Sequence, residues 1–458
     1  MNAPVPRRPA TWGEHLAAAG LLLAMALLFF APTLAQGLVL APGDGVAQYF
    51  PQRVIAAEAY RQGEIPFWNP YNFSGMPLLG AIQGGVLYPG NMPFLFLPPV
   101  LAMNVATVLA YWVAGVGTFA FGRAVGMTRV GAFAAALTFM LGGYMTVHVM
   151  HLTITHAASL LPFLLLAVER FRQTLATRFA VLGAVLVGLQ ILAGHPQMTA
   201  YSLILTGAYA LYRAFGHARP LRFLGTLALM VAFGVGLSLM QLLPTLELIQ
   251  ASQRQAISFE RLVWYSLPPL GLPTLVFPYL FGSRFPMGPL DTPFWGQPDW
   301  QYWTQSYVGL APILLALVAL GAARRLSQVR FWTAAAVLAL LLTLGHHTPL
   351  YTLWGQLPVV NSMPYPHRHN LEFTFAMGML AGFGLTALAD GAARARVALA
   401  ALAVAMLAVV GAVFAFSPSF IARTQPLLPA GIDLTKALSP THPTFWLPLL
   451  LLAALAIL

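Results

Sequence analysis

The chain alternates between apolar runs and polar connections, and this alternation constrains its fold more than any other feature. Hydrophobic residues make up 59% of the chain and charged residues only 8%, whereas a soluble domain carries about a quarter charged residues. Most of the chain must therefore face lipid or other helices. The predicted spans are approximately Leu16–Leu34, Val100–Gly122, Gly131–Val147, Thr155–Val168, Phe179–Ala193, Thr199–Tyr212, Phe223–Leu243, Tyr307–Ala322, Phe331–Leu344, Phe373–Leu388, Val397–Phe416 and Phe445–Leu458.

These runs predict an all-α polytopic integral membrane protein with about 11–12 transmembrane helices, since each crossing takes about 20 residues. The whole chain, residues 1–458, would form one transmembrane domain. Its long polar parts are the first polar segment (35–91), the second polar segment (247–306) and the third polar segment (346–370). We expect short interfacial helices within them. The chain has no Cys, which excludes disulfides and Cys-based metal sites.

The distribution of charges predicts the orientation of these spans. Most of the 23 Lys and Arg residues fall in short connections, whereas most of the 12 Asp and Glu residues fall in the three polar segments. This positive-inside pattern places the N-terminus in the cytoplasm and the polar segments outside it. The net charge of +11 then reflects orientation, and we expect no nucleic-acid partner. The first run follows Arg7 and Arg8 and could be a cleaved signal peptide, but its long apolar core favours a span.

The first polar segment contains the most motif-dense stretch of the chain, from Gly43 to Pro77. Residues 48–62 predict a short helix, with Pro51 in its first turn and Gly63 at its end. As an interfacial helix, it would rest Phe50, Val54, Ile55 and Ala57 on the membrane and turn Arg53, Glu58 and Arg61 to water. Five prolines then predict an ordered, non-helical stretch: Pro66, Pro70, Pro77, Pro89 and Pro93.

Several motifs follow one another along the chain in a specific order and spacing. They are Asp44, Gln48, Tyr49 and Pro51; Gly63, Pro66, Trp68-Asn69-Pro70, Gly75, Pro77 and Tyr88-Pro89; Gly194-His195-Pro196-Gln197; Pro244, Ser252 and Arg254; Pro278 and Phe281-Gly282; Tyr307 and Gly309; Gly345, Thr348-Pro349-Leu350-Tyr351 and Arg368. This set, from Asp44 to about Leu380, resembles the bacterial YfhO-like membrane proteins, which are similar to the GT-C glycosyltransferases. The chain departs from that pattern at Pro364, where family members often carry a second Arg, and family members often run longer after the last motif.

The resemblance implies a GT-C-like enzyme of the bacterial inner (plasma) membrane. Such an enzyme moves a sugar from a polyprenyl-phosphate donor to a glycan or glycolipid acceptor of the cell envelope, so its partners are these molecules and membrane lipid. The resemblance also implies a catalytic Asp in the first polar segment, here Asp44. Transfer needs a base for the acceptor hydroxyl and positive charge or hydrogen-bond donors for the departing phosphate. A divalent cation is one option for the cofactor.

Asp44 lies just after the first predicted span, within a Gly-Asp-Gly sequence. Its carboxylate would act as the general base or as a metal ligand that organises the phosphate. The alternative is a turn or helix N-cap, because Gly-Asp-Gly favours turns. Glu58 is a candidate second carboxylate, although a solvated pair with Arg61, three residues on, is the simpler role.

Basic side chains are the candidates for binding the donor phosphate. Arg368, flanked by His367 and His369, would clamp the phosphate bidentately, or would anchor the next span at the interface. Arg254 has the same two interpretations. His195 precedes Pro196 at a predicted helix start, where it would touch the phosphate or cap the helix.

Histidines and aromatic residues complete the set of candidates. His148 and His151 are three residues apart and could form a metal pair, although polar packing is the commoner role. Tyr49, Trp68 and Tyr88 could stack on a sugar or belong to the aromatic belt of the interface. Gln48 and Asn69 match the family motif and are further substrate-binding candidates.

Two functional classes remain in competition, with a non-catalytic assembly protein as a third. A transporter or flippase of lipid-linked saccharides would carry polar residues near the middle of its spans. Here the ionisable residues cluster in polar segments and at span ends, which favours an interfacial enzyme. We expect a cleft under the first and second polar segments, with Asp44 and Arg368 within about 15 Å of each other so that one sugar phosphate can touch both.

Overall fold

The computed structural model describes residues 11–252, 257–282, 306–321, 326–357, 360–390, 393–427 and 433–439, together with 441, 442, 445, 446 and 450. The chain divides into two compact units. Unit 1 comprises Met1–Leu141 and Met145–Ile257, and unit 2 comprises Gly142–Tyr144 and Ser258–Leu458.

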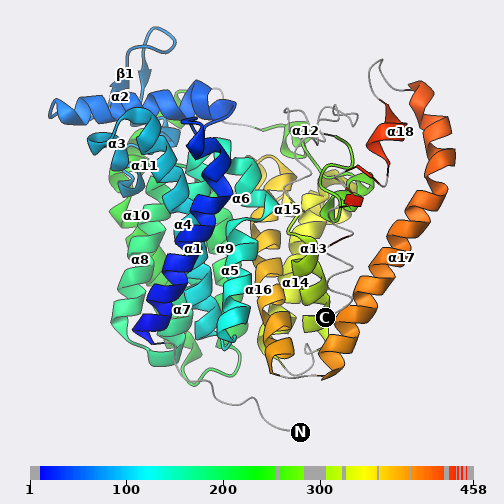
Figure 1. The fold of residues 1–458 in the computed structure, drawn as a ribbon. Helices are drawn as coiled ribbons and strands as arrows, with labels where there is room; N and C mark the ends of the chain where they lie inside the picture. Colours follow the sequence, from blue (N-terminus) through cyan, green and yellow to red (C-terminus); the bar gives the residue numbers. More distant parts are fainter. Residues whose placement is uncertain are drawn as a thin grey trace. The chain divides into compact units, whose positions relative to one another are not determined.

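The regular secondary structure of the described residues is nearly all helical (Figure 1). The first helices are α1 (Trp12–Ala35), α2 (Phe50–Arg61), α3 (Pro93–Phe96), α4 (Pro99–Ala124), α5 (Arg129–Met140), α6 (Gly143–Val147), α7 (Leu152–Thr174), α8 (Thr177–Leu192), α9 (Pro196–Ala214), α10 (Pro220–Leu237) and α11 (Leu239–Gln250). The later helices are α12 (Phe259–Leu262), α13 (Leu310–Leu320), α14 (Ser327–Thr343), α15 (Pro349–Trp354), α16 (Asn370–Ala389), α17 (Ala393–Thr424) and α18 (Leu434–Ala437). Strands β1 (Trp68–Asn69) and β2 (Met76–Pro77) pair antiparallel.

Local sequence explains where the long helices of unit 1 begin. The Thr11 hydroxyl accepts the N–H of Glu14 and caps α1. Helices α4, α9 and α10 begin at Pro99, Pro196 and Pro220, and proline is well tolerated there because a first-turn N–H has no partner within the helix.

Unit 1 is a helical bundle in which α4 packs against α1, α5 and α7, and α7 packs against α8 and α9. Helices α8 and α10 approach so closely that a Cβ on Gly234 would lie 2.5 Å from the Cβ of Val187. Small residues at such crossings are typical of helix pairs in membranes, where close packing, rather than the hydrophobic effect, holds the helices together.

The two ends of unit 1 differ in chemistry. At one end, Glu14 pairs with Arg129 at the start of α5, and Glu169 near the end of α7 pairs with Arg213 near the end of α9. Helices α2 and α3 and strand β1 lie at the opposite end (Figure 1). The basic connections and the first polar segment are thus on opposite sides of unit 1, as the charge pattern predicts.

Unit 2 is organised around α16, which packs against α13, α14 and α17. A Cβ on Gly384 of α16 would lie 1.9 Å from the carbonyl oxygen of Leu315 in α13, so only glycine permits this contact. Gly309 precedes the start of α13, and a 3₁₀ turn over Pro366–His369 leads directly into α16.

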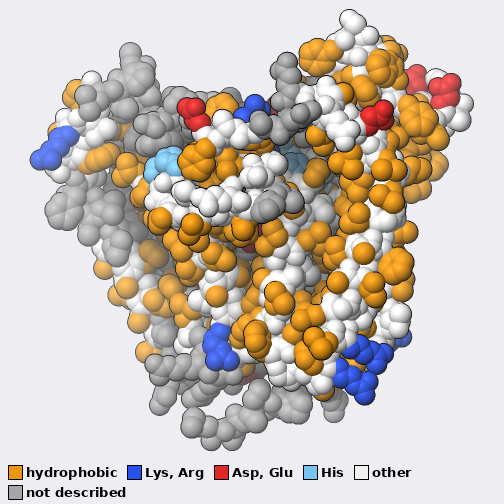
Figure 2. Space-filling model, turned by 180° about the vertical axis from the view of Figure 1, so that it is seen from behind, with side chains coloured by type: hydrophobic (Ala, Val, Ile, Leu, Met, Phe, Trp, Pro, Cys, Tyr) orange, Lys and Arg blue, Asp and Glu red, His pale blue; other side chains and the backbone are white. Residues whose placement is uncertain are grey.

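Six helical stretches of the described chain are long and apolar enough to cross a membrane. They are Trp12–Ala35, Pro99–Ala124, Arg129–Met150, Leu152–Thr174, Pro220–Leu237 and Pro366–Ala389. Shorter apolar helices occupy Thr177–Leu192, Leu310–Leu320, Ser327–Thr343 and Leu399–Ala408. Hydrophobic side chains cover much of the helix surface seen in Figure 2. The fold is therefore nearly all-α and compatible with a membrane protein, while its likeness to GT-C enzymes remains a prediction.

Two predicted spans are interrupted. The run Gly131–Val147 breaks between α5 and α6, and the run Phe223–Leu243 breaks at Ser238 between α10 and α11. The Ser238 hydroxyl donates back to the carbonyls of Gly234 and Val235, which competes with continuation of the helix. Most of the last predicted run, Phe445–Leu458, lies outside the described residues.

The helix of the first polar segment is α2, and its surroundings correct two predictions. A π-helical turn over Gly45–Tyr49 precedes it, and Gly63 ends it with a φ of +80°. Arg53 does not face water: its side chain packs into unit 1 and the residue is 2% exposed. The predicted Glu58–Arg61 pair is also wrong, because the Arg61 guanidinium donates instead to the backbone carbonyls of Phe94 and Leu95 in α3.

Candidate functional site

The turn that carries Asp44 is built by its two flanking glycines. Gly43 has a φ of +54°, a conformation that glycine adopts without strain. A Cβ on Gly45 would lie 2.9 Å from the Cβ of Ala41 and 3.3 Å from the carbonyl oxygen of Met150. The Gly-Asp-Gly backbone therefore fits closely against the 3₁₀ turn over His148–Met150, and Asp44 is held there by backbone geometry.

Asp44 lies beside a histidine from the start of α7. Its Oδ2 is 3.4 Å from Nε2 of His151. The Asp44 side chain is 65% exposed and that of His151 is 15% exposed, so the imidazole is held within the protein while the carboxylate remains accessible. The His151 ring also meets the Tyr49 ring edge-on, with centroids 5.8 Å apart, and lies 5.4 Å from the ring of His148.

This arrangement suits a carboxylate that takes a proton from a substrate. A proton on His151 Nε2 would face Asp44 Oδ2 and orient the carboxyl group, leaving Oδ1 for an incoming hydroxyl. The N-cap alternative finds no support, since the Asp44 side chain makes no capping hydrogen bond to the turn that follows.

The metal alternative finds no ligand set in the described part of the chain. Its residues present no group of three or more His, Asp or Glu side chains that could hold a metal ion. His148 and His151 are neighbours, as predicted, but their rings pack with each other and with Tyr49.

Other candidates from the first polar segment make structural contacts. The Gln48 amide donates to Oε1 of Gln83 at 2.6 Å. Asn69 is 3% exposed and its Oδ1 accepts the N–H of Tyr71, so it stabilises the β1–β2 turn. Trp68 is 54% exposed and remains accessible for stacking.

Tyr88 and His195 lie deeper in unit 1. The Tyr88 ring is 4.8 Å from the ring of His156, and burial raises the pKa of the Tyr88 hydroxyl above its ordinary value. His195 is 4% exposed, and its Nδ1 accepts the N–H of Met198 at 3.4 Å. The capping role predicted for His195 is therefore confirmed, and its contact with phosphate remains a prediction.

In unit 2, Arg368 and His367 lie in an aromatic environment. The Arg368 guanidinium carbon is 4.8 Å from the centre of the Tyr365 ring, and the His367 ring lies 5.5 Å from that of Tyr265. Arg368 is partly exposed, whereas His367 is 5% exposed. Arg254 lies outside the described residues.

Asp44 and Arg368 belong to different compact units. The expected approach of the two side chains within about 15 Å therefore remains a prediction. Within unit 1 the structure brings together Asp44, Tyr49, His148 and His151; within unit 2 it brings together Arg368 and His367.

Sequence reasoning missed Arg53 and its partner Asn91. Arg53 Nε donates to Oδ1 of Asn91 at 3.0 Å, and Nη1 donates to the Tyr49 carbonyl at 2.9 Å. The sequence contains a signal for the burial of Arg53. Arg53, Ala56, Ala57 and Tyr60 recur at helical spacing, and alanines on one face of a helix indicate that this face packs closely against protein and does not face water.

Comparisons with known proteins found no relative. No family model matches the chain, no curated protein matches it, and no solved structure matches it.

Proposed function

We propose that this protein is a membrane glycosyltransferase that moves a sugar from a polyprenyl-phosphate donor to a cell-envelope glycan or glycolipid acceptor. Asp44 is the general base that deprotonates the acceptor hydroxyl. His151 positions the Asp44 carboxylate. The first polar segment faces the extracytoplasmic side of a bacterial inner membrane, and the basic connections face the cytoplasm.

One observation supports this proposal most. A solvent-accessible carboxylate is held beside a largely buried histidine, in the first polar segment a short distance after an apolar helix long enough to cross a membrane. A base at this position would meet the head group of a lipid-borne donor while the lipid chain stays in the membrane. The order of motifs along the chain is a second, weaker support.

The departing phosphate needs positive charge, and Arg368 with His367 is the candidate from unit 2. Trp68 is the candidate stacking surface for a sugar, because it is exposed on the β1–β2 hairpin. These roles follow from the chemistry of the side chains.

The test is sugar transfer by the detergent-solubilised full chain, with a polyprenyl-phosphate sugar as donor and mass spectrometry of the lipid and glycan products. The conservative substitution Asp44→Asn keeps the shape of the side chain and removes the base. Because a positioned base contributes ~10²–10⁴-fold, transfer should fall by at least that order while thermal melting stays unchanged.

The same assay separates the enzyme from a transporter or flippase of lipid-linked saccharides. A flippase moves the donor across a vesicle bilayer and forms no glycosidic bond, whichever residue stands at position 44. If both wild type and Asp44→Asn moved a fluorescent donor without forming any product, the protein would be a transporter and not a transferase.

A further inference from the structure

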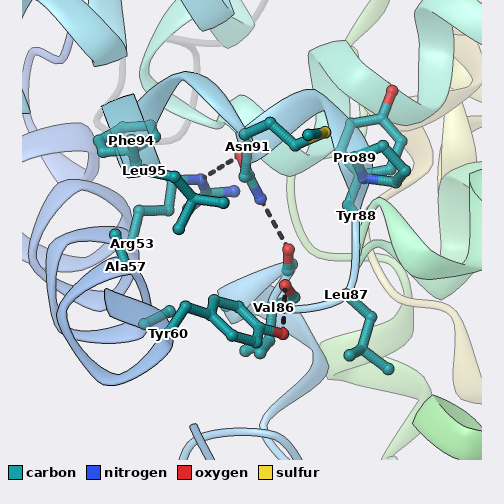
Figure 3. Close-up of a pocket in the computed structure, with 14 residues that line it drawn as sticks. Arg53, Ala57, Tyr60, Val86, Leu87, Tyr88, Pro89, Asn91, Phe94 and Leu95 are labelled. Carbon is teal, nitrogen blue, oxygen red and sulfur yellow. Dashed lines mark hydrogen bonds between the residues drawn. The ribbon is translucent and has the colours of Figure 1, made fainter. Parts of the chain in front are cut away.

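A pocket of about 500 Å³ adjoins α2, and Asp44 is not among the residues that line it. Figure 3 shows Arg53, Phe94 and Leu95 on one side of it and Tyr88 and Pro89 on the other. All of its lining residues come from α2, α3 and the chain between them within unit 1.

Arg53 is the charged residue of this pocket, and no carboxylate of the described chain pairs with it. Two of its nitrogens donate to neutral oxygens, the Tyr49 carbonyl and the Asn91 side chain. Its third nitrogen, Nη2, has no hydrogen-bond partner in the described chain. Arg53 also forms no ion pair with any described Asp or Glu, although it is 2% exposed.

A buried cation of this kind is costly unless an anion accompanies it. Burial lowers the pKa of Arg53 to about 10, so the guanidinium still carries its charge at neutral pH. Elsewhere in unit 1 the buried Glu169 is paired with two arginines. The missing partner of Arg53 is therefore best supplied by a ligand.

The surroundings of Arg53 define the chemistry of that ligand. Gly85 leaves space beside the guanidinium, since a Cβ there would lie 3.4 Å from Nη2 and 2.8 Å from Nδ2 of Asn91. The Asn91 amide is held in place by its bond to the Gly85 carbonyl at 2.7 Å. Apolar side chains, among them Leu87 and Leu95, form much of the remaining wall. A ligand with an anionic group at Arg53 and an apolar chain along this wall would match both the charged and the apolar parts of the pocket.

We propose that the Arg53 pocket binds a phosphate group, with Arg53 Nη2 as its principal donor and Asn91 beside it. The apolar wall favours a phosphate that is esterified to an apolar chain, such as a lipid phosphate, over free phosphate. Guanidinium groups match phosphate oxygens in geometry as well as charge. This proposal does not depend on sugar transfer or on the role of Asp44.

The experiment is isothermal titration calorimetry on the detergent-solubilised full chain. The probes are farnesyl phosphate, farnesol and inorganic phosphate. Wild type should bind farnesyl phosphate more tightly than the other two. Arg53→Met should weaken that binding about 10- to 100-fold, the range expected for losing a hydrogen bond to a charged group. Arg53→Lys should retain part of the affinity, because it keeps the charge.

Two further variants keep the test decisive. Arg178→Met, an exposed arginine at the start of α8, makes the same change in net charge away from the pocket and should leave affinity unchanged. Leu87→Trp fills the apolar part of the pocket and keeps Arg53 in the sequence, so it should weaken farnesyl phosphate binding even where Arg53→Met folds poorly. Equal affinity for farnesyl phosphate and inorganic phosphate would support an anion site and identify free phosphate as the ligand.

Three results would overturn the proposal. They are no binding of either phosphate by wild type, equal binding of farnesol and farnesyl phosphate, and unchanged affinity of a folded Arg53→Met. Folding of every variant is checked by thermal melting in the same detergent.

Discussion

Glu169 and Asp44 are two carboxylates of unit 1 in opposite situations. Glu169 is 1% exposed and accepts hydrogen bonds from Arg172 at 2.7 Å, Arg213 at 3.2 Å and Tyr209 at 2.8 Å. The Asp44 side chain is 65% exposed and has His151 beside one oxygen. The first carboxylate has its hydrogen-bonding capacity used within the protein, and the second has an oxygen left for another molecule.

The comparison distinguishes charges that stabilise the fold from charges available for chemistry. A buried charge surrounded by matched donors helps to fix the ends of α7 and α9 relative to each other. A charge held in place by backbone geometry, with open hydrogen-bonding capacity, is suited to bind or react. Arg53 is buried, and one of its nitrogens has no partner in the described chain. By the same criterion Arg53, like Asp44, is a charge available to another molecule, whereas Arg172 and Arg213 stabilise the fold.

The largest effect on stability is expected for Glu169→Gln. It removes the charge that Arg172 and Arg213 share, and breaking a buried ion pair costs about 3–5 kcal/mol; we expect about 3 kcal/mol because both arginines partly reach solvent. The midpoint of thermal or SDS-induced unfolding measures this change. Glu58→Gln is the matched control, since Glu58 is exposed and forms no ion pair in the described chain. Equal midpoints for the two variants would contradict the comparison.

A smaller effect is expected for Gly45→Ala. The added methyl group would collide with Ala41 and approach the Met150 carbonyl, and overpacking of this kind costs about 1–3 kcal/mol. It should also displace Asp44 and lower transfer. Gly207→Ala in α9 adds the same methyl group where nothing lies within 4 Å, so it should change neither stability nor transfer. Full transfer by Gly45→Ala would show that the turn does not position Asp44.

The smallest of these effects is expected for His151→Ala. If His151 only orients the carboxylate, transfer should fall about tenfold, less than the ~10²-fold lower bound expected for loss of the base. The fall should appear in kcat with KM nearly unchanged, because the histidine need not touch the substrate. Initial-rate kinetics at several donor concentrations measure both constants, and an increase in KM alone would instead place His151 in substrate binding.

The helices and the ends of unit 1 could largely be predicted from the sequence. Apolar runs located α1, α4 and α7, and proline and glycine marked several boundaries, because these signals are local. The breaks at Leu141–Gly142 and Ser238 were missed, since the hydrophobic run continues through both.

The contacts of the candidate site were harder to predict. Asp44 could be singled out by its position after a span, but its approach to His151 depends on the packing of the first turn against a segment more than 100 residues later. Arg53 was placed in water because charge usually indicates exposure. Its burial depends on α3 and the Gly84–Gly85 turn, which cover that face of α2.

The most direct test compares two isosteric substitutions, Asp44→Asn and Glu169→Gln, in both sugar transfer and thermal melting. Asp44→Asn should lose at least ~10²-fold in transfer and melt like wild type. Glu169→Gln should melt lower while its transfer per folded molecule stays near that of wild type. Near-equal transfer by wild type and Asp44→Asn, with equal melting, would remove Asp44 from the active site and contradict the proposed function.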